Sequence, residues 1–280
     1  MRLKLVRHLW GIDLTHGLHH YLPDWQAVGY EALEVSIRMV PDRLAFLSFL
    51  EDSRLQWVPQ VFSRGLVPGG SVPGHLESLR LQIEECLDHR PLFFNVHSGY
   101  DNWSPAEAED FYGAALILEK QVGIPLSHET HRSRYFSTPW QTKPILELFP
   151  DLRLTCDFSH WVCVCERLLP DLGDVVALAA LHCHHVHSRV GFEEGPQVPD
   201  PAAPEYATHL LAHEDWWDAI WQSQRARGMT ESTLTPEFGP PPYMQTLPHS
   251  QAPVTDLVKI CDWMAARQAQ RFLSKNFSGL

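Results

Sequence analysis

"SPAEAEDFYGAALILEKQVGIPLSHETH", residues 104–131, contains one complete helix-to-strand unit. Ser104 suits a helix N-cap, Pro105 suits the first helical position, and Glu107 completes a capping box. Gly123 is a residue type that commonly ends a helix. The following run, 124–131, is apolar and ends in polar residues, which predicts a strand. Units of this kind, repeated, build parallel sheets.

The same alternation recurs along the whole chain. Strands are predicted at 3–10, 32–37, 55–62, 91–98, 124–131, 152–160, 181–189 and 232–238. Helices are predicted at 24–29, 41–52, 72–89, 104–122, 139–150, 172–180, 206–228 and 253–275. This order predicts an α/β protein, a single (β/α)8 TIM barrel that forms one domain over 1–280. A doubly wound open sheet is the alternative, but no G-x-G-x-x-G motif follows the first strand.

Composition and charge narrow the class of protein. Hydrophobic residues make up 44% and charged residues 20% of the chain, as in ordinary globular proteins. The formal net charge of −12 argues against nucleic acid and against an anionic membrane surface as partners. No apolar run is long enough for a signal peptide or a membrane span. The six cysteines lack the spacing of a disulfide framework, so we expect reduced thiols and a cytoplasmic location.

Polar residues end four successive predicted strands. In a TIM barrel the chemistry lies at the carboxyl ends of the strands. Glu129, Asp157, His187 and Glu237 fall there and are therefore expected to converge. Three carboxylates at one point would repel one another, and a divalent cation would remove that repulsion. The sequence predicts one such cation; Mn²⁺, Mg²⁺, Co²⁺ and Zn²⁺ all suit these ligands.

The seventh predicted strand, "LHCHHVHSR" at 181–189, is rich in histidine. Strand alternation places Cys183, His185 and His187 on one face. His187 is nearest the carboxyl end and is the predicted ligand, while His185 is expected one layer deeper. The alternative for the run is a buried strand with hydrogen-bonded imidazoles.

Other polar residues have two interpretations each. Glu34 either lies in the barrel interior or is a strand glutamate held by an arginine. Cys163 and Cys165 are expected to be buried thiols rather than a zinc pair. Arg132 and Arg134, just after the fifth strand, either bind an anionic substrate group or form loop salt bridges.

Five short motifs in the right order give the sequence a family resemblance. "GYEALEVS", "LSHETH", "CDFSHW", "HVHSR" and "TPEFG" resemble the xylose isomerase-like TIM-barrel superfamily, from the second strand to the eighth. That superfamily holds sugar and sugar-phosphate isomerases and epimerases, and the related AP endonuclease family 2. The resemblance implies one metal held by Glu129, Asp157, His187 and Glu237. It also implies that His160 contacts a substrate oxygen. Arg189 departs from the family pattern, because it follows His187 by only two residues, whereas the corresponding arginine of relatives comes several residues later.

These observations predict a metal-dependent isomerase or epimerase of a sugar, sugar phosphate or polyol-like compound. The metal would stabilise an enediolate while Glu129 and Glu237 act as catalytic acid and base. The predicted substrate contacts are His160, Arg189, Arg132, His97 and His131.

Two other functions remain open from the sequence. One is a metal-dependent hydrolase of the AP endonuclease type, which would bind two or three metal ions. The other is a non-catalytic barrel that binds a small ligand. A small carbohydrate-like molecule is the expected partner, and a homodimer is an expected assembly because relatives often pair.

Overall fold

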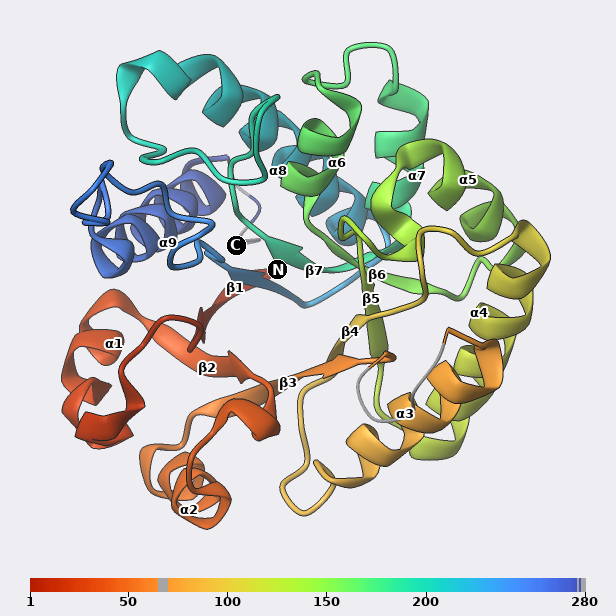
Figure 1. Ribbon diagram of the computed structural model, residues 1–280, viewed down its shortest axis with the longest axis horizontal. Helices are drawn as coiled ribbons and strands as arrows, with labels where there is room; N and C mark the ends of the chain where they lie inside the picture. The colour runs from red at the N-terminus through yellow and green to blue at the C-terminus, as the bar shows by residue number, and fades with distance from the viewer. Residues whose placement is uncertain (65–69, 276, 278–280) are drawn as a thin grey trace.

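Eight parallel strands close into a barrel in chain order, with β8 paired to β1 (Figure 1). The computed structural model describes residues 1–64, 70–275 and 277. The strands are β1 (Arg2–His8), β2 (Tyr30–Val35), β3 (Gln56–Phe62), β4 (Phe94–His97), β5 (Leu126–Glu129), β6 (Arg153–Cys156), β7 (Cys183–His187) and β8 (Glu231–Thr235). The predicted TIM barrel is therefore confirmed.

Helices surround the barrel on all sides (Figure 1). They are α1 (Leu22–Val28), α2 (Arg43–Ser53), α3 (Val72–Glu84), α4 (Pro105–Val122), α5 (Pro139–Leu148), α6 (Phe158–Cys165), α7 (Gly173–His182), α8 (Ala207–Ala226) and α9 (Leu257–Ser274). Short 3-10 turns lie in the connections: η1 (Leu14–His16), η2 (Leu18–His20), η3 (Ile37–Met39), η4 (Tyr135–Ser137) and η5 (Pro204–Tyr206). Among the described residues, no helix has the length and apolarity to cross a membrane.

Both ends of α4 are capped by the residues that the sequence predicts. The Ser104 side chain accepts a hydrogen bond from the Glu107 N–H, and the Glu107 carboxylate accepts one from the Ser104 N–H. Gly123 ends α4 in the left-handed conformation, with φ of 69°. Together these contacts satisfy backbone groups that a helix end leaves unpaired.

The sixth strand is shorter than predicted. A strand over 152–160 is wrong: β6 ends at Cys156, and Asp157 is the N-cap of α6. The Asp157 Oδ1 accepts a hydrogen bond from the Ser159 N–H at 3.1 Å, and this cap starts a helix where the sequence reads as a strand. His160 therefore lies on a helix, one turn from Asp157.

The seventh strand contains an irregularity that changes the direction of Cys183. Leu154 and Thr155 are adjacent on β6, yet their partners on β7 are Cys183 and His185. Adjacent strand residues face opposite sides, so Cys183 and His185 do too. The prediction that Cys183 shares a face with His185 and His187 is wrong.

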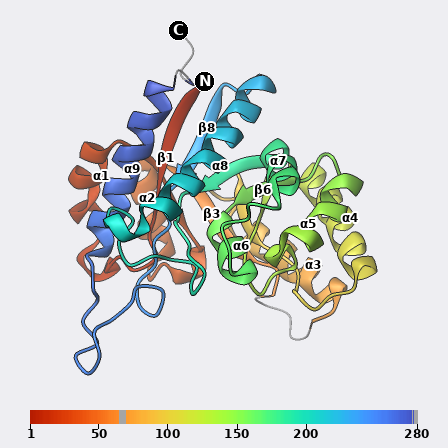
Figure 2. The same cartoon turned by 90° about the horizontal axis from the view of Figure 1, so that it is seen from above.

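Inside the barrel, an apolar layer supports a polar one. Val6, Ala32, Val58 and Phe93 form a separate buried cluster. His8, Glu34, Gln60 and Asn95 follow them by two positions each and so point into the same interior, nearer the carboxyl ends of the strands. The long segment between β8 and α9, blue in Figure 2, projects at this carboxyl end, opposite the N-terminus.

Candidate functional site

Four side chains meet at the carboxyl end of the barrel: Glu129 and His187 end β5 and β7, and Asp157 and Glu237 follow β6 and β8. Glu129, Asp157, His187 and Glu237 each offer a ligand atom, and these atoms lie within 4.8 Å of one another. His187 Nδ1 is 3.0 Å from Glu237 Oε2, 3.8 Å from Glu129 Oε2 and 3.9 Å from Asp157 Oδ2. All four residues are buried. We refer to them below as the carboxylate–histidine group.

The carboxylate–histidine group has polar atoms that nothing in the described part of the chain satisfies. His187 Nδ1, Glu129 Oε1 and Glu237 Oε2 are buried and make no hydrogen bond. Buried polar atoms in folded proteins are nearly always paired, so these atoms indicate a missing partner. Three carboxylates and the neighbouring Arg189 leave two net negative charges, which one divalent cation would balance. The residues present therefore fit a divalent cation.

Glu34 on β2 fixes the orientation of His187. Its Oε1 lies 3.0 Å from His187 Nε2, and its Oε2 accepts a hydrogen bond from Thr235 Oγ1 at 2.5 Å. Burial would lower the pKa of His187, but the surrounding carboxylates outweigh it and raise that pKa well above its usual value. The contact with Glu34 keeps a proton on Nε2, so Nδ1, which faces the three carboxylates, is the nitrogen that would release its proton to bind a cation. Burial would raise the pKa of Glu34, but His187 and His185 outweigh it and hold that pKa well below its usual value. Glu34 thus lies in the barrel interior and is not held by an arginine.

Two amide side chains hold the carboxylates in place. Gln60 Nε2 donates to Glu237 Oε1 at 3.0 Å and to Glu34 Oε1 at 3.2 Å. Asn95 Nδ2 donates to Glu129 Oε2 and to Glu34 Oε1, both at 2.9 Å. Each amide therefore holds one oxygen of a glutamate of the group, and Glu129 Oε1 is left without a hydrogen bond to any described residue. Neither amide was predicted as a site residue, because glutamine and asparagine at strand ends carry no pattern that points to this role.

Arg189 partly neutralises the carboxylate–histidine group. It is buried, donates to Asp157 Oδ2 and lies 3.3 Å from Glu237 Oε2. It also donates to Ser159 Oγ at 3.1 Å and to His160 Nε2 at 2.6 Å. Burial raises the pKa of Asp157 to about 6, an effect that Arg189 and His187 reduce and the two glutamates increase.

Three imidazoles lie above the group. His97 Nε2 is 2.9 Å from Glu129 Oε2, and the His131 ring is 4.7 Å from that of His97 and 3.9 Å from that of His160. Burial lowers the pKa of His131 to about 3, so its ring is neutral. His160 Nδ1 is buried and has no hydrogen-bond partner among the described residues. His97, Glu129 and His131 also form a second set of possible ligands that shares Glu129.

A cavity of about 230 Å³ opens onto this arrangement. Its lining residues come from several loops at the barrel mouth: Trp10, Met39, Gln60, Phe62, His97, His131, Arg134, Arg189, Glu237 and Tyr243. Arg132 is not among them; its guanidinium carbon lies over the Tyr243 ring, 4.7 Å from the centroid. Of the two arginines that follow β5, Arg134 is the one that faces this cavity. No sequence pattern pointed to Tyr243, which lies in the segment between β8 and α9.

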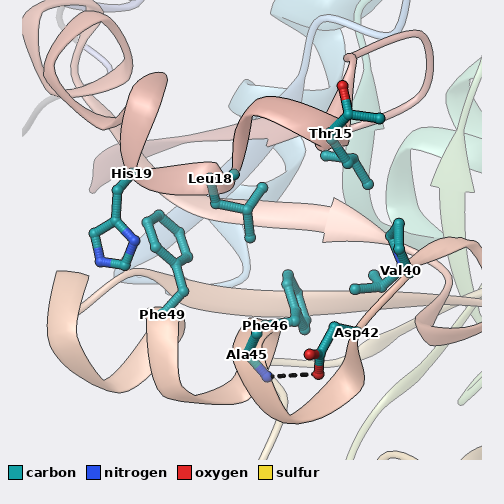
Figure 3. A pocket seen from close by; sticks show the side chains of 11 residues that line it. Thr15, Leu18, His19, Val40, Asp42, Ala45, Phe46 and Phe49 are labelled. Carbon is teal, nitrogen blue, oxygen red and sulfur yellow. Dashed lines mark hydrogen bonds between the residues drawn. The ribbon is translucent and has the colours of Figure 1, made fainter.

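A second pocket, of about 290 Å³, lies between η1, η2 and the start of α2 (Figure 3). Its wall is mainly apolar, with Leu18, Phe46 and Phe49 among the side chains. The Asp42 carboxylate is already used, because it accepts a hydrogen bond from the Ala45 N–H at 3.0 Å as the cap of α2. We therefore place the chemistry at the barrel mouth and not in this pocket.

Comparison with known proteins supports the fold. No family model matches the sequence, and no curated protein matches it. A xylose isomerase-like TIM barrel protein from Mycobacterium smegmatis, solved in complex with magnesium, has a TM-score of 0.65 and 13% identity over 97% of both chains. D-allulose 3-epimerase from Methylomonas sp., in complex with D-allulose, has a TM-score of 0.57 and 12% identity over 98% of this chain and 97% of that one.

A third similar structure belongs to the hydrolase branch. AP endonuclease, family 2, from Brucella melitensis has a TM-score of 0.55 and 12% identity over 82% of this chain and 91% of that one. At these identities the likeness concerns the fold. The chain therefore has the fold of the xylose isomerase-like TIM barrels, as its motifs implied.

Proposed function

We propose that this protein is a divalent-metal-dependent isomerase or epimerase of a small carbohydrate-like substrate. The observation that supports the proposal is the convergence of one ligand atom from each of four buried residues, Glu129, Asp157, His187 and Glu237, within 4.8 Å of one another. Glu129, Asp157, His187 and Glu237 would hold the metal, and Mn²⁺, Mg²⁺, Co²⁺ and Zn²⁺ all suit one imidazole and three carboxylates. A bound divalent cation supplies Lewis acidity that stabilises the negative charge of an enediolate.

Proton transfer falls to the two glutamates. Burial would raise the pKa of Glu129, but His97 and His187 outweigh it and hold that pKa well below its usual value. Glu129 is therefore ionised at neutral pH and able to act as a base. One glutamate takes the proton from the carbon beside the carbonyl, the C–H electron pair moves toward the carbonyl oxygen, and a carboxyl group returns a proton to carbon.

The remaining side chains would bind and orient the substrate. His160 Nδ1 faces no partner among the described residues and can bond a substrate oxygen. His97 and Arg189 line the cavity and are also in position for substrate contacts. His131 holds its Nδ1 against the Arg132 carbonyl oxygen, so its other nitrogen is the one left for substrate. Arg132 would act on the substrate indirectly, by holding the Tyr243 ring, over which its guanidinium lies.

The test combines metal analysis with proton exchange. We expect one divalent cation per chain, and exchange of substrate protons in D₂O with at least one member of a ketose panel. Glu129→Gln and Glu237→Gln should each lower that exchange by about 100-fold or more, as loss of an acid–base group does. Glu84→Gln, on the exposed face of α3, is the control. Exchange that survives in both barrel variants would refute the acid–base assignment.

The hydrolase is the second candidate function. The second ligand set, His97, Glu129 and His131, favours it, because a shared carboxylate can bridge two metal ions. Two or three ions per chain would support the hydrolase, and one would support proton transfer. No metal uptake at all would support the non-catalytic ligand-binding barrel.

A further inference from the structure

Arg134 differs from Arg189 and Arg132, the two other described arginines that follow β5 and β7, in its partners. Its Nε and Nη1 atoms are buried, and neither makes a hydrogen bond to any described residue. Arg189 is paired with Asp157 and Glu237, and Arg132 lies on the Tyr243 ring. A buried guanidinium without a carboxylate is costly, because it has lost water and gained no anion in return.

The surroundings of Arg134 increase the positive potential. Burial lowers the pKa of Arg134; Glu129 offsets part of that effect, and Arg64 adds to it. The same charges act on His75, whose pKa falls to about 4 through burial, Arg134 and Arg64. Arginine remains charged at neutral pH despite such shifts. Two guanidinium groups, of Arg134 and Arg64, therefore lie close enough to repel each other, with Glu129 and Asp101 as the nearby carboxylates.

The loop that carries Arg134 is held firmly. Its N–H donates to the His131 carbonyl at 3.1 Å, and the next N–H, of Tyr135, donates to the Ser98 carbonyl at 3.3 Å. Phe136 is fully buried and stacks on Tyr112, with ring centroids 4.4 Å apart. The backbone that carries Arg134 is therefore held in place before any ligand arrives, which lowers the entropy cost of binding.

We infer that Arg134 binds an anionic group, a carboxylate or a phosphoryl group, carried by the substrate of this site. Arg134 lines the same cavity as His97 and Glu237, so one small molecule can reach both the guanidinium and the carboxylate–histidine group. The unpaired Nε–H and Nη1–H groups lie on different edges of the guanidinium, and each can donate a charge-assisted hydrogen bond to an oxygen of a carboxylate or of a phosphoryl group. The inference rests on the proposed function and specifies its substrate class: an acidic or phosphorylated sugar rather than a neutral one.

Sulfate and acetate serve as probes, the first for a phosphoryl group and the second for a carboxylate. Their binding to the protein, both without metal and after incubation with Mn²⁺, is followed by calorimetry, with chloride used to keep the ionic strength constant. The proteins are wild type, Arg134→Met, Arg134→Lys and, as control, Arg80→Met. Arg80 lies on α3 between Glu77 and Glu84 and is far more exposed.

We expect saturable binding of at least one probe to wild type and to the control. Affinity should fall about tenfold or more in Arg134→Met, with Arg134→Lys intermediate, because lysine keeps the charge but loses the planar pair of donors. Sulfate binding alone would indicate a phosphorylated substrate, and acetate binding alone an acidic one. Failure of both probes to bind wild type, or equal binding to wild type and Arg134→Met, would overturn the inference.

Stability of the anion-free protein separates ligand binding from a structural role. Without anion, Arg134→Met should unfold at the same denaturant concentration as wild type or a higher one, because an unpaired buried charge is gone. A clear loss of stability, or failure to fold, would show that Arg134 is structural and would also overturn the inference.

Mn²⁺ affinity, measured on the same samples, keeps this inference distinct from the proposed function. Arg134→Met should bind Mn²⁺ as wild type does. If Mn²⁺ binds and the anion result fails, only the Arg134 inference falls. If wild type takes up no Mn²⁺ but the anion result holds, the metal-dependent function falls and Arg134 remains part of an anion-binding site.

Discussion

Nε2 of His187 lies 3.0 Å from Oε1 of Glu34, across the barrel from β7 to β2. This contact sets which imidazole nitrogen faces the carboxylates of Glu129, Asp157 and Glu237. Glu34 also accepts hydrogen bonds from Gln60, Asn95 and Thr235. The geometry of the carboxylate–histidine group therefore depends on a residue that lies below it.

Glu34→Gln should weaken Mn²⁺ binding by about 10- to 100-fold, as changes in residues that orient a metal ligand do. The NH₂ group of the new glutamine would face donor groups of Gln60, Asn95 or Thr235, from which the Glu34 carboxylate accepts hydrogen bonds. The free energy of unfolding should therefore also fall by about 1–3 kcal/mol. Calorimetric titration with Mn²⁺ and urea unfolding measure the two effects.

Glu31→Gln is the matched control for this change, because Glu31 is on the same strand but pairs at the surface with Arg2. Unchanged Mn²⁺ affinity in Glu34→Gln would contradict the orienting role of Glu34.

Gly99 and Gly123 form a matched pair for the loop that carries Arg134. Both have positive φ, 73° and 69°. A Cβ at Gly99 would lie 2.9 Å from the Tyr135 Cβ, whereas one at Gly123 would meet nothing within 4 Å. Gly123→Ala should cost about 1 kcal/mol from backbone strain alone. Gly99→Ala should cost at least about 1 kcal/mol more, from the overlap with Tyr135.

Urea unfolding of the two alanine variants gives this difference directly. We also expect Gly99→Ala to weaken anion binding, because Tyr135 adjoins Arg134. Equal stability losses in the two variants would show that the backbone next to Ser98 can shift to relieve the overlap with Tyr135 at no cost in free energy of unfolding.

His213 on α8 should make the protein less stable in acid. Its Nδ1 donates to the His209 carbonyl and its Nε2 accepts the Gly191 N–H, so the folded protein needs the neutral ring. Burial lowers its pKa to about 4. Between about pH 6.5 and 4 the unfolded chain binds a proton that the folded one does not, so stability falls as pH falls.

The contribution of His213 between pH 7 and pH 5 should be about 2 kcal/mol. His213→Gln keeps a donor and an acceptor without titrating, so it should lose correspondingly less stability over that interval. The exposed His20→Gln is the control. An identical pH dependence in wild type and His213→Gln would rule out this contribution.

The barrel was predictable because each of its units carries local signals. Ser104, Glu107 and Gly123 mark the two ends of α4, and signals of this kind act over a few residues. The convergence of Glu129, Asp157, His187 and Glu237 follows from the fold, because parallel strands end at one edge. Whether these residues bind metal is a separate question, which the proposed metal analysis addresses.

What the sequence did not reveal depends on contacts between distant residues. Glu34 meets His187, 153 positions away, and no local pattern distinguishes it from a surface glutamate. The outward direction of Cys183 depends on the register shift against β6, which is a property of the strand pair. Arg134, not Arg132, lines the cavity because Ser133, between them, has a φ of 62°. Positive φ is uncommon for serine, so the sequence does not predict it.

Asp157 divides its two oxygens between two tasks. Oδ1 accepts hydrogen bonds from the first turn of α6, and Oδ2 belongs to the carboxylate–histidine group. Any shift of that carboxylate must therefore pull on the helix start, together with His160, one turn along. The affinity of the carboxylate–histidine group for a cation and the position of the His160 ring, which would contact the substrate, are therefore linked through Asp157. A substitution that changes one of them also changes the other.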